Sequence, residues 1–181
     1  MEHLSREQLR EVLRCAREAR KRDWVLLLIT FWHGLRASEA VGLTPENFRD
    51  GFLTVQRLKG SLRTTQPLVE DADELLNERA AVESWIALHG RRERLFPISR
   101  VQFYRLMRRY GAAAGLPRHL CHPHVLKHSI ARQTIREAGI ENVRQWLGHV
   151  SIASTGEYLK VSDDEAAAAI LGAAKKPSTR G

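Results

Sequence analysis

The sequence predicts a mainly α-helical domain with a small antiparallel β-hairpin or sheet. Two observations lead to this fold class. Apolar residues recur at helical spacing through most of the chain, whereas alternating or β-branched strand patterns are confined to residues 51–70. With 181 residues, 43% of them hydrophobic, the chain is long enough to bury a core of its own.

Two helices and a short third one are expected in the first part of the chain. Residues 4–20 show an amphipathic pattern that opens with a capping box at Ser5 and Gln8. A second helix is expected from Asp23, as N-cap, to the end of "FWHG", because Gly34 can take the left-handed conformation that ends helices. The next elements are a short helix over 35–43 and a turn over 44–47.

The strand signal lies in "FLTVQ" (52–56) and "TTQPLV" (64–69), separated by the glycine-containing "LKGS". We interpret these segments as two antiparallel strands, to which a neighbouring edge would add a third. Further helices are expected over 71–89, 99–114, 123–138, 142–148 and 162–176. We therefore expect a domain over 1–160 and a C-terminal helix and tail over 161–181.

The charge of the chain favours a polyanionic partner. Lys and Arg outnumber Asp and Glu by 29 to 21, which gives a formal net charge of +8. The N-terminus is charged and resembles no signal peptide, and the longest apolar run, "WVLLLITFW" (24–32), is too short to span a bilayer. The two cysteines give no sign of an oxidising compartment. We expect a cytoplasmic protein that binds nucleic acid and no membrane.

Four short motifs occur in a characteristic order. They are "GLRASE" (34–39), "RLKG" (57–60), "HVLK" (124–127) and "LGHVSIASTGEY" (147–158). Together they resemble the catalytic domain of the tyrosine recombinases, the phage integrase family, over about residues 4–160. "HGLRASE", "RLKGSLRTTQPL" and "HPHVLKHS" are especially similar to the short recombinases that invert fimbrial switches. Both a naturally short recombinase and a fragment of a longer integrase fit this pattern.

Cleavage of a DNA phosphodiester without a metal needs a nucleophile, positive charge on the non-bridging oxygens and an acid for the leaving 5′ oxygen. The resemblance implies that Tyr158 is the nucleophile and forms a 3′-phosphotyrosine. It also implies that Lys59 is the general acid. Arg36 follows a glycine break, and its guanidinium can hold two phosphate oxygens. Glu39, one helical turn later, can orient Arg36.

The motif "HVLK" departs from the family pattern His-x-x-Arg. His124 and Lys127 share one helix face, and the resemblance implies that both contact the scissile phosphate. Lysine keeps the charge of the expected arginine and loses its two-pronged geometry. We expect an active enzyme, because the other motifs are intact. His149 completes the set as a donor to the phosphate or an aid to Tyr158.

Arg57 and Arg63 flank Lys59 and are expected to contact DNA backbone phosphates. The resemblance implies double-stranded DNA as substrate, a homotetramer on paired sites, and no cofactor. A tail exchanged between subunits would fit such an assembly. Two rival hypotheses are a non-catalytic DNA-binding protein on the same fold and a type IB topoisomerase.

A zinc site at 121–128 is a further alternative. His124 and His128 have the spacing of metal ligands on a helix, and Cys121 or His122 could add a third ligand. The segment lacks a His-Glu-x-x-His motif and a carboxylate partner. We therefore expect no metal here, and assign Cys121, His122 and His128 to the scaffold.

Overall fold

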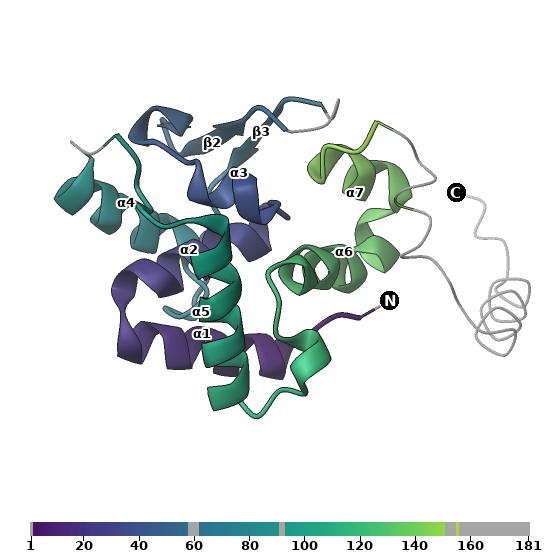
Figure 1. Ribbon diagram of the computed structural model, residues 1–181. Helices are drawn as coiled ribbons and strands as arrows, with labels where there is room; N and C mark the ends of the chain where they lie inside the picture. Colours follow the sequence, from purple (N-terminus) through teal and green to yellow (C-terminus); the bar gives the residue numbers. More distant parts are fainter. Residues whose placement is uncertain (1, 58–61, 91–92, 151–154, 156–181) are drawn as a thin grey trace, which may run out of the picture.

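The computed structural model describes residues 2–57, 62–90, 93–150 and 155. Within these ranges the predicted fold class is confirmed: seven α-helices surround a common core, and one three-stranded antiparallel sheet lies at its edge. Helices α6 and α7 lie on one side of the molecule, and α4 lies on the other (Figure 1). No helix in this part of the chain is long and apolar enough to cross a membrane.

Helices α1 (Arg6–Ala19) and α2 (Lys21–Trp32) pack against each other, and α2 also contacts α3, α4 and α6. The capping box that begins α1 is confirmed, since the Ser5 hydroxyl accepts from the Gln8 N–H. The prediction that Asp23 is an N-cap is wrong, because α2 begins at Lys21. Asp23 is buried inside the helix and accepts a hydrogen bond from Tyr110 Oη at 2.7 Å. That bond satisfies a carboxylate that would otherwise be costly to bury.

The sheet follows the short helix α3 (Ala37–Val41) and the 3-10 turn η1 (Pro45–Asn47). Its strands β1 (Phe48–Arg49), β2 (Phe52–Val55) and β3 (Thr64–Pro67) are antiparallel neighbours in chain order. Val55 pairs with Thr64 and Leu53 with Gln66, so these four side chains point to the same, buried face. Polar side chains therefore face the protein interior on β3.

Helix α4 (Glu78–His89) begins later than predicted. The Asp71 and Asp73 carboxylates accept from backbone N–H groups two residues onward, which makes local turns, and Asn77 caps the helix instead. The remaining elements are α5 (Arg100–Ala113), η2 (Arg118–Leu120), α6 (His124–Ala138) and α7 (Ile140–Trp146). The predicted helix over 162–176 lies outside the described residues.

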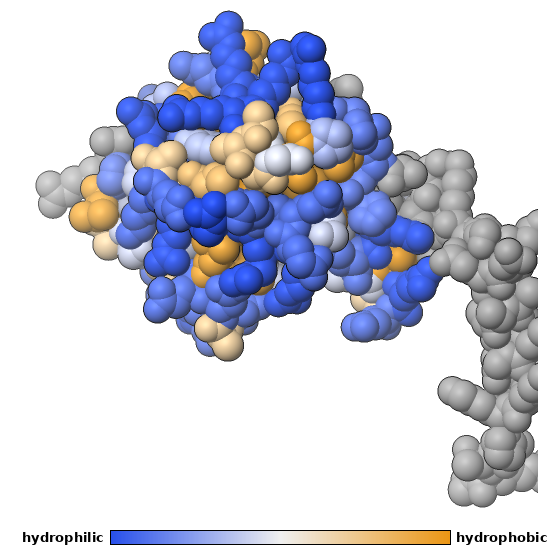
Figure 2. All heavy atoms as spheres, turned by 90° about the horizontal axis from the view of Figure 1, so that it is seen from below, coloured by the Kyte–Doolittle hydropathy of each residue, from blue (hydrophilic) through white to orange (hydrophobic). Residues whose placement is uncertain are grey.

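Helix α2 lies at the centre of the core, with nine of its twelve residues buried. The surface seen from below in Figure 2 is mostly hydrophilic and surrounds smaller apolar areas. Helix α7 reaches the sheet through contacts with β3, so the C-terminal part of the described chain closes onto the hairpin. This closure brings together segments that are far apart in the sequence.

Gly34 ends the α2 segment in the left-handed conformation, with φ +55°. A Cβ atom there would overlap Leu147 Cδ2. We predict that Gly34→Ala lowers the free energy of unfolding by about 3 kcal/mol or more, because a left-handed alanine already costs about 1–2 kcal/mol before the overlap is added. Urea unfolding measures the loss.

Gly115→Ala is the matched control. Its φ is +71°, and a Cβ there meets nothing within 4 Å. This variant should lose only the conformational part, about 1–2 kcal/mol. Equal losses in the two variants would show that the approach of Gly34 to Leu147 contributes nothing.

Candidate active site

Arg36 stands at the N-cap of α3, directly after the turn at Gly34 and Leu35. Glu39 holds it by two contacts. Its Oε1 accepts from Arg36 Nη1 at 2.9 Å, and its Oε2 accepts from the Arg36 backbone N–H at 2.8 Å. The Glu39 side chain is 1% exposed, whereas that of Arg36 is 27% exposed. The expected pairing of Glu39 with Arg36 is therefore present, and it leaves the arginine partly open to solvent.

His124 and Lys127 lie in the first turn of α6, three residues apart. His124 is exposed, and Lys127 is only 2% exposed. The Lys127 ammonium donates to the carbonyl oxygen of Leu147, just past the end of α7, at 3.3 Å. Lysine has three N–H donors, so this bond leaves the group able to donate to a further acceptor.

The surroundings of Lys127 disfavour its charged form. Burial, followed by the charges of Arg36 and Arg57, lowers the pKa of the ammonium to about 7 against the opposing effect of Glu39. Arginine keeps its charge in such a place because its pKa is much higher. Lysine in place of the expected arginine thus gives a cation whose charge depends on pH near neutrality.

His149 follows α7 after Gly148, which has φ +66°. It is 8% exposed, and its Nδ1 lies 3.0 Å from the hydroxyl of the buried Thr155. Burial, followed by the charges of Lys127, Arg36 and Arg57, lowers the pKa of His149 to about 4. The imidazole is therefore neutral at pH 7.

The structure brings four predicted site residues together from three segments. Burial lowers the pKa of His124, and the charges of Lys127 and Arg36 contribute to its shift and to that of His149; Arg36 also contributes to the shift of Lys127. Such mutual effects require the groups to lie within electrostatic reach of one another. Glu39 acts in the opposite direction and raises the pKa of Lys127. The result is a cluster at helix ends whose positive charge comes from Arg36 and Lys127.

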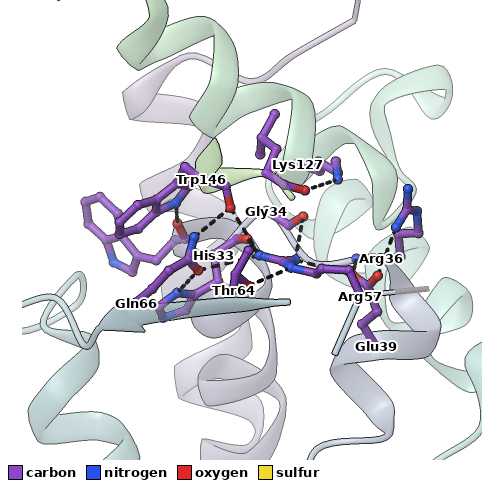
Figure 3. Close-up of polar contacts among 11 residues, drawn as sticks. His33, Gly34, Arg36, Glu39, Arg57, Thr64, Gln66, Lys127 and Trp146 are labelled. Carbon is purple, nitrogen blue, oxygen red and sulfur yellow. Dashed lines mark hydrogen bonds and ion pairs between the residues drawn. The ribbon is translucent and has the colours of Figure 1, made fainter. Parts of the chain in front are cut away.

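The prediction that Arg57 contacts DNA phosphates is contradicted by its burial. Its side chain is 0% exposed, and its guanidinium bonds within the protein (Figure 3). It donates to the carbonyl oxygens of His33 and Trp146 at 2.8 and 3.2 Å, and to Glu39 Oε2 at 3.3 Å. Arg63 is exposed, so its predicted phosphate contact stays a prediction.

Lys59 and Tyr158, the predicted general acid and nucleophile, lie outside the described residues. The adjoining described segments are Arg57 on one side of the hairpin, and His149 and Thr155 before Tyr158 in the chain. Arg57 bonds to Glu39, and His149 is a member of the cluster.

The described residues contain no group of three His, Cys, Asp or Glu side chains placed to hold a metal ion. The rings of His124 and His128 meet edge to face, with centroids 4.4 Å apart. His122 approaches Glu2 at 3.6 Å, and the Cys121 thiol donates to the carbonyl oxygen of Pro117. Each of these side chains has contacts of its own in the scaffold.

Several interior polar residues of the site were missed by sequence reasoning. His33 is fully buried between Glu78, at 2.8 Å from its Nε2, and Gln66, at 2.7 Å from its Nδ1. The signal for Arg57 was present: residues 53, 55 and 57 alternate inward, which continues the buried face of β2. The partners of His33 and Arg57 depend on pairing across the fold, and no local pattern predicts them.

Comparison with known protein families gives one match that covers most of the chain. The model described as "Phage integrase family" matches residues 2–165. Tyrosine recombinase XerA of Pyrococcus furiosus is 30% identical over 166 residues, which cover 88% of this chain and 57% of XerA. The type 1 fimbriae regulatory protein FimE of Escherichia coli K12 is 32% identical over 152 residues, which cover 76% of this chain and 73% of FimE. The chain thus spans little more than half the length of XerA.

Solved structures share the fold at low sequence identity. The crystal structure of XerA recombinase matches with a TM-score of 0.77 at 21% identity, covering 97% of this chain and 65% of that one. XerH site-specific recombinase, in a pre-cleavage complex with its difH substrate, matches with a TM-score of 0.72 at 20% identity, covering 94% and 55%. These likenesses establish the arrangement of the helices and the sheet.

We predict that Lys127 makes stability depend on pH. Its pKa is about 7 in the folded protein and about 10.4 in an unfolded chain. Between these values the unfolded chain binds the extra proton, so the contribution of Lys127 to the free energy of unfolding rises with pH. The slope is at most about 1.4 kcal/mol per pH unit.

Unfolding of the wild type and of Lys127→Met at pH 6 to 10 checks this. The difference between their free energies of unfolding should be constant below pH 7. Above pH 7 the wild type should become steadily more stable relative to the variant. Lys21→Met, which removes an exposed lysine, is the control for loss of a lysine as such. A difference between the wild type and Lys127→Met that stays constant from pH 6 to 10 would contradict the pKa assigned to the buried ammonium.

Proposed function

This chain belongs to the phage integrase family, and on that premise we propose that it is a site-specific DNA recombinase. It cleaves and rejoins double-stranded DNA through a 3′-phosphotyrosine. Since its substrate is DNA, we place it in the cytoplasm. The chain spans 57% of XerA, so any contribution of further segments to DNA binding adds to what is proposed for these residues.

The observation that carries this proposal is the cluster formed by Arg36, His124, Lys127 and His149. The Arg36 guanidinium and the Lys127 ammonium repel each other when both are charged, and Glu39 is already paired with two arginines. A phosphate would relieve this repulsion, because its non-bridging oxygens supply negative charge and accept hydrogen bonds. The cluster therefore suits a phosphodiester better than a neutral ligand.

We assign the chemical steps as follows. The Tyr158 oxygen gives up its proton to solvent water and attacks phosphorus, while the bond from phosphorus to the 5′ oxygen breaks. Lys59 gives a proton to that oxygen, which leaves as a hydroxyl. Rejoining runs the same steps in reverse, with the 5′ hydroxyl as attacking group. The phosphotyrosine conserves the energy of the broken bond, so no nucleotide or metal is consumed.

The other residues stabilise the charge that develops on the phosphate. The Arg36 guanidinium holds non-bridging oxygens in its fork, and Lys127 and His124 supply further donors. We assign the Thr155 hydroxyl as donor to His149 Nδ1. This choice puts the proton of the neutral imidazole on Nε2, from which it is donated to the phosphate.

The alternative is a DNA-binding protein without cleavage activity. Two observations keep it open: the Lys127 side chain is nearly buried, and its ammonium bonds to Leu147. Catalysis at this site needs a Lys127 that is charged and that turns one donor toward the phosphate. Bound phosphate would favour both, because its charge raises the pKa of a nearby ammonium.

For residues 161–181 we propose docking on a neighbouring subunit of a tetramer bound to paired sites. The supporting surface is an apolar groove of about 290 Å³ between α2, α6 and α7. Ile130, Val143 and the rings of Trp32 and Trp146 line it. The segment "AAAAILGAA" (166–174) supplies small and aliphatic side chains of matching chemistry.

The first test traps the covalent intermediate on a pool of duplexes of random sequence, each with a nick near its centre. After cleavage the short fragment beside the nick diffuses away, so rejoining is prevented. We predict a covalent adduct with the wild type and none with Tyr158→Phe, which should still bind DNA. No adduct from either protein, with equal DNA binding, would favour the non-catalytic alternative. Relaxation of supercoiled DNA by monomers, without strand exchange, would favour a type IB topoisomerase.

Lys127 variants in the same assay test whether this residue acts as a second cation on the phosphate, beside Arg36. Lys127→Arg should give at least wild-type yield of adduct, because it restores the forked donor. Lys127→Ala should give none. An alanine variant as active as the wild type would remove Lys127 from the mechanism.

Removal of the tail tests the assembly. A chain ending at residue 160 should still form adducts on single sites and should fail to hold two DNA sites together in a gel-mobility assay. Ala138→Arg places a charge at the groove from an exposed position. This variant should also form adducts on single sites and fail to hold two DNA sites together. Normal pairing of sites by both variants would contradict docking of the tail in this groove.

A further inference from the structure

Arg57 is enclosed where four segments meet. It follows β2 and reaches β3 through Thr64 Oγ1, which accepts from its Nε at 2.9 Å. Its two Nη groups reach the turn after α2, the α3 carboxylate and the last residue of α7. The dashed lines in Figure 3 converge on this guanidinium from Glu39, Gly34 and the Trp146 carbonyl. One side chain thus joins parts of the chain that are up to 89 positions apart.

One set of contacts fixes the segment that presents Arg36. Arg57 donates to the carbonyl oxygens of His33 and Gly34, at 2.8 and 3.4 Å, three and two residues before Arg36 in the chain. It also shares Glu39 Oε2 with the Arg36 backbone N–H. Both the backbone turn and the carboxylate that orients Arg36 are therefore tied to the same guanidinium.

The second set fixes the end of α7, which leads to His149. The carbonyl oxygen of Trp146 has no partner within its own helix, and it accepts from Arg57 at 3.2 Å and from Gln66 Nε2 at 2.6 Å. Two residues on, Gly148 lies against Arg57: a Cβ there would come within 2.8 Å of Arg57 Cγ. The path of the chain into His149 is thereby set by the Arg57 side chain.

We propose that Arg57 is a positioning residue for DNA cleavage. It touches no DNA, and from inside the protein it holds Arg36 and His149 in one arrangement around the scissile phosphate. The effect on the rate of cleavage rests on the proposed function. The effect of Arg57 on the positions of Arg36 and His149 concerns the protein without DNA.

The residue type follows from the number of acceptors. Six oxygen atoms receive the Arg57 N–H groups, and these oxygens point to it from different directions. Lysine has three donors on one nitrogen and cannot span them. An apolar residue would leave Glu39 buried beside fewer donors and several carbonyl oxygens unpaired. The arrangement therefore needs a guanidinium at this position.

The experiment uses Arg57→Lys, with Val82→Ala as a control for lost stability at a buried position of α4 away from these contacts. Single-turnover adduct formation at saturating DNA should fall about 100-fold in Arg57→Lys, the scale of a small misplacement of catalytic groups. The Kd for DNA should stay within about threefold of wild type, because a buried group makes no phosphate contact. Val82→Ala should leave the rate within about threefold at a temperature where it is folded.

A double variant tests whether Arg57 acts through Arg36. Arg36→Lys with Arg57→Lys should lose clearly less than the product of the two single losses, since an arginine already lost cannot be misplaced further and only the effect through His149 remains. Multiplied losses would overturn the action through Arg36. A raised Kd with an unchanged rate in Arg57→Lys would instead indicate a direct DNA contact, and would also overturn the proposal.

Hydrogen exchange without DNA separates this inference from the proposed function. The Arg36 amide bonds to Glu39, and the Leu62 amide bonds to the carbonyl oxygen of Gly148 at 3.2 Å. Both amides should exchange at least about tenfold faster in Arg57→Lys than in Val82→Ala. Unchanged exchange would overturn the positioning role. Failure of the wild type to form an adduct would contradict the recombinase function. The positioning role of Arg57 would then be decided by the hydrogen-exchange result alone.

Discussion

The buried ion pair between Arg57 and Glu39 lies between the segment that presents Arg36 and the end of α7, which leads to His149. Glu39 would be costly to bury alone, and Arg57 and Arg36 together neutralise it. The same guanidinium satisfies the carbonyl oxygens that end α2 and α7. Neither helix end could be enclosed without such a partner, because unpaired buried carbonyl groups destabilise a fold. The closure of α7 onto the sheet therefore depends on a charged group in the interior.

The residues of the candidate site lie at the ends of helices, where the chain changes direction. Arg36 precedes α3, His124 and Lys127 begin α6, and His149 follows α7. Ends of rigid elements give fixed positions and still leave side chains near the surface. Burial, followed by repulsion from neighbouring positive charges, lowers the pKa of Lys127 and of His149. The negative charge of a bound phosphodiester would attract these cations. The same charges that destabilise the free protein therefore favour the binding of DNA.

The sequence predicted much of the fold because most of its signals are local. The capping box at Ser5, the stop at Gly34 and the strand alternation all act within a few residues. One error arose where a distant partner determines the place of a residue: Asp23 looked like a cap and is held inside by Tyr110. The other arose from a competing local pattern, because Asp71 and Asp73 form turns before α4 begins.

The candidate site shows the same division. Arg36, Glu39, His124, Lys127 and His149 were found from motif order, and the structure places them together. Arg57 was assigned to the surface because it stands beside Lys59 in the motif, although its alternation with Leu53 and Val55 indicates the interior. Its acceptors come from α2, α3, β3 and α7, which only the folded chain assembles.

The central claim is that this cluster delivers a DNA phosphate to Tyr158. The most direct measurement is the mass of the tryptic peptide that remains linked to DNA after trapping. The chain has three tyrosines, and the peptide 145–160 contains Tyr158 alone, whereas Tyr104 and the buried Tyr110 lie in other peptides. The account predicts a 3′-phosphate linked to 145–160. Attachment to another peptide, or through a 5′-phosphate, would contradict it.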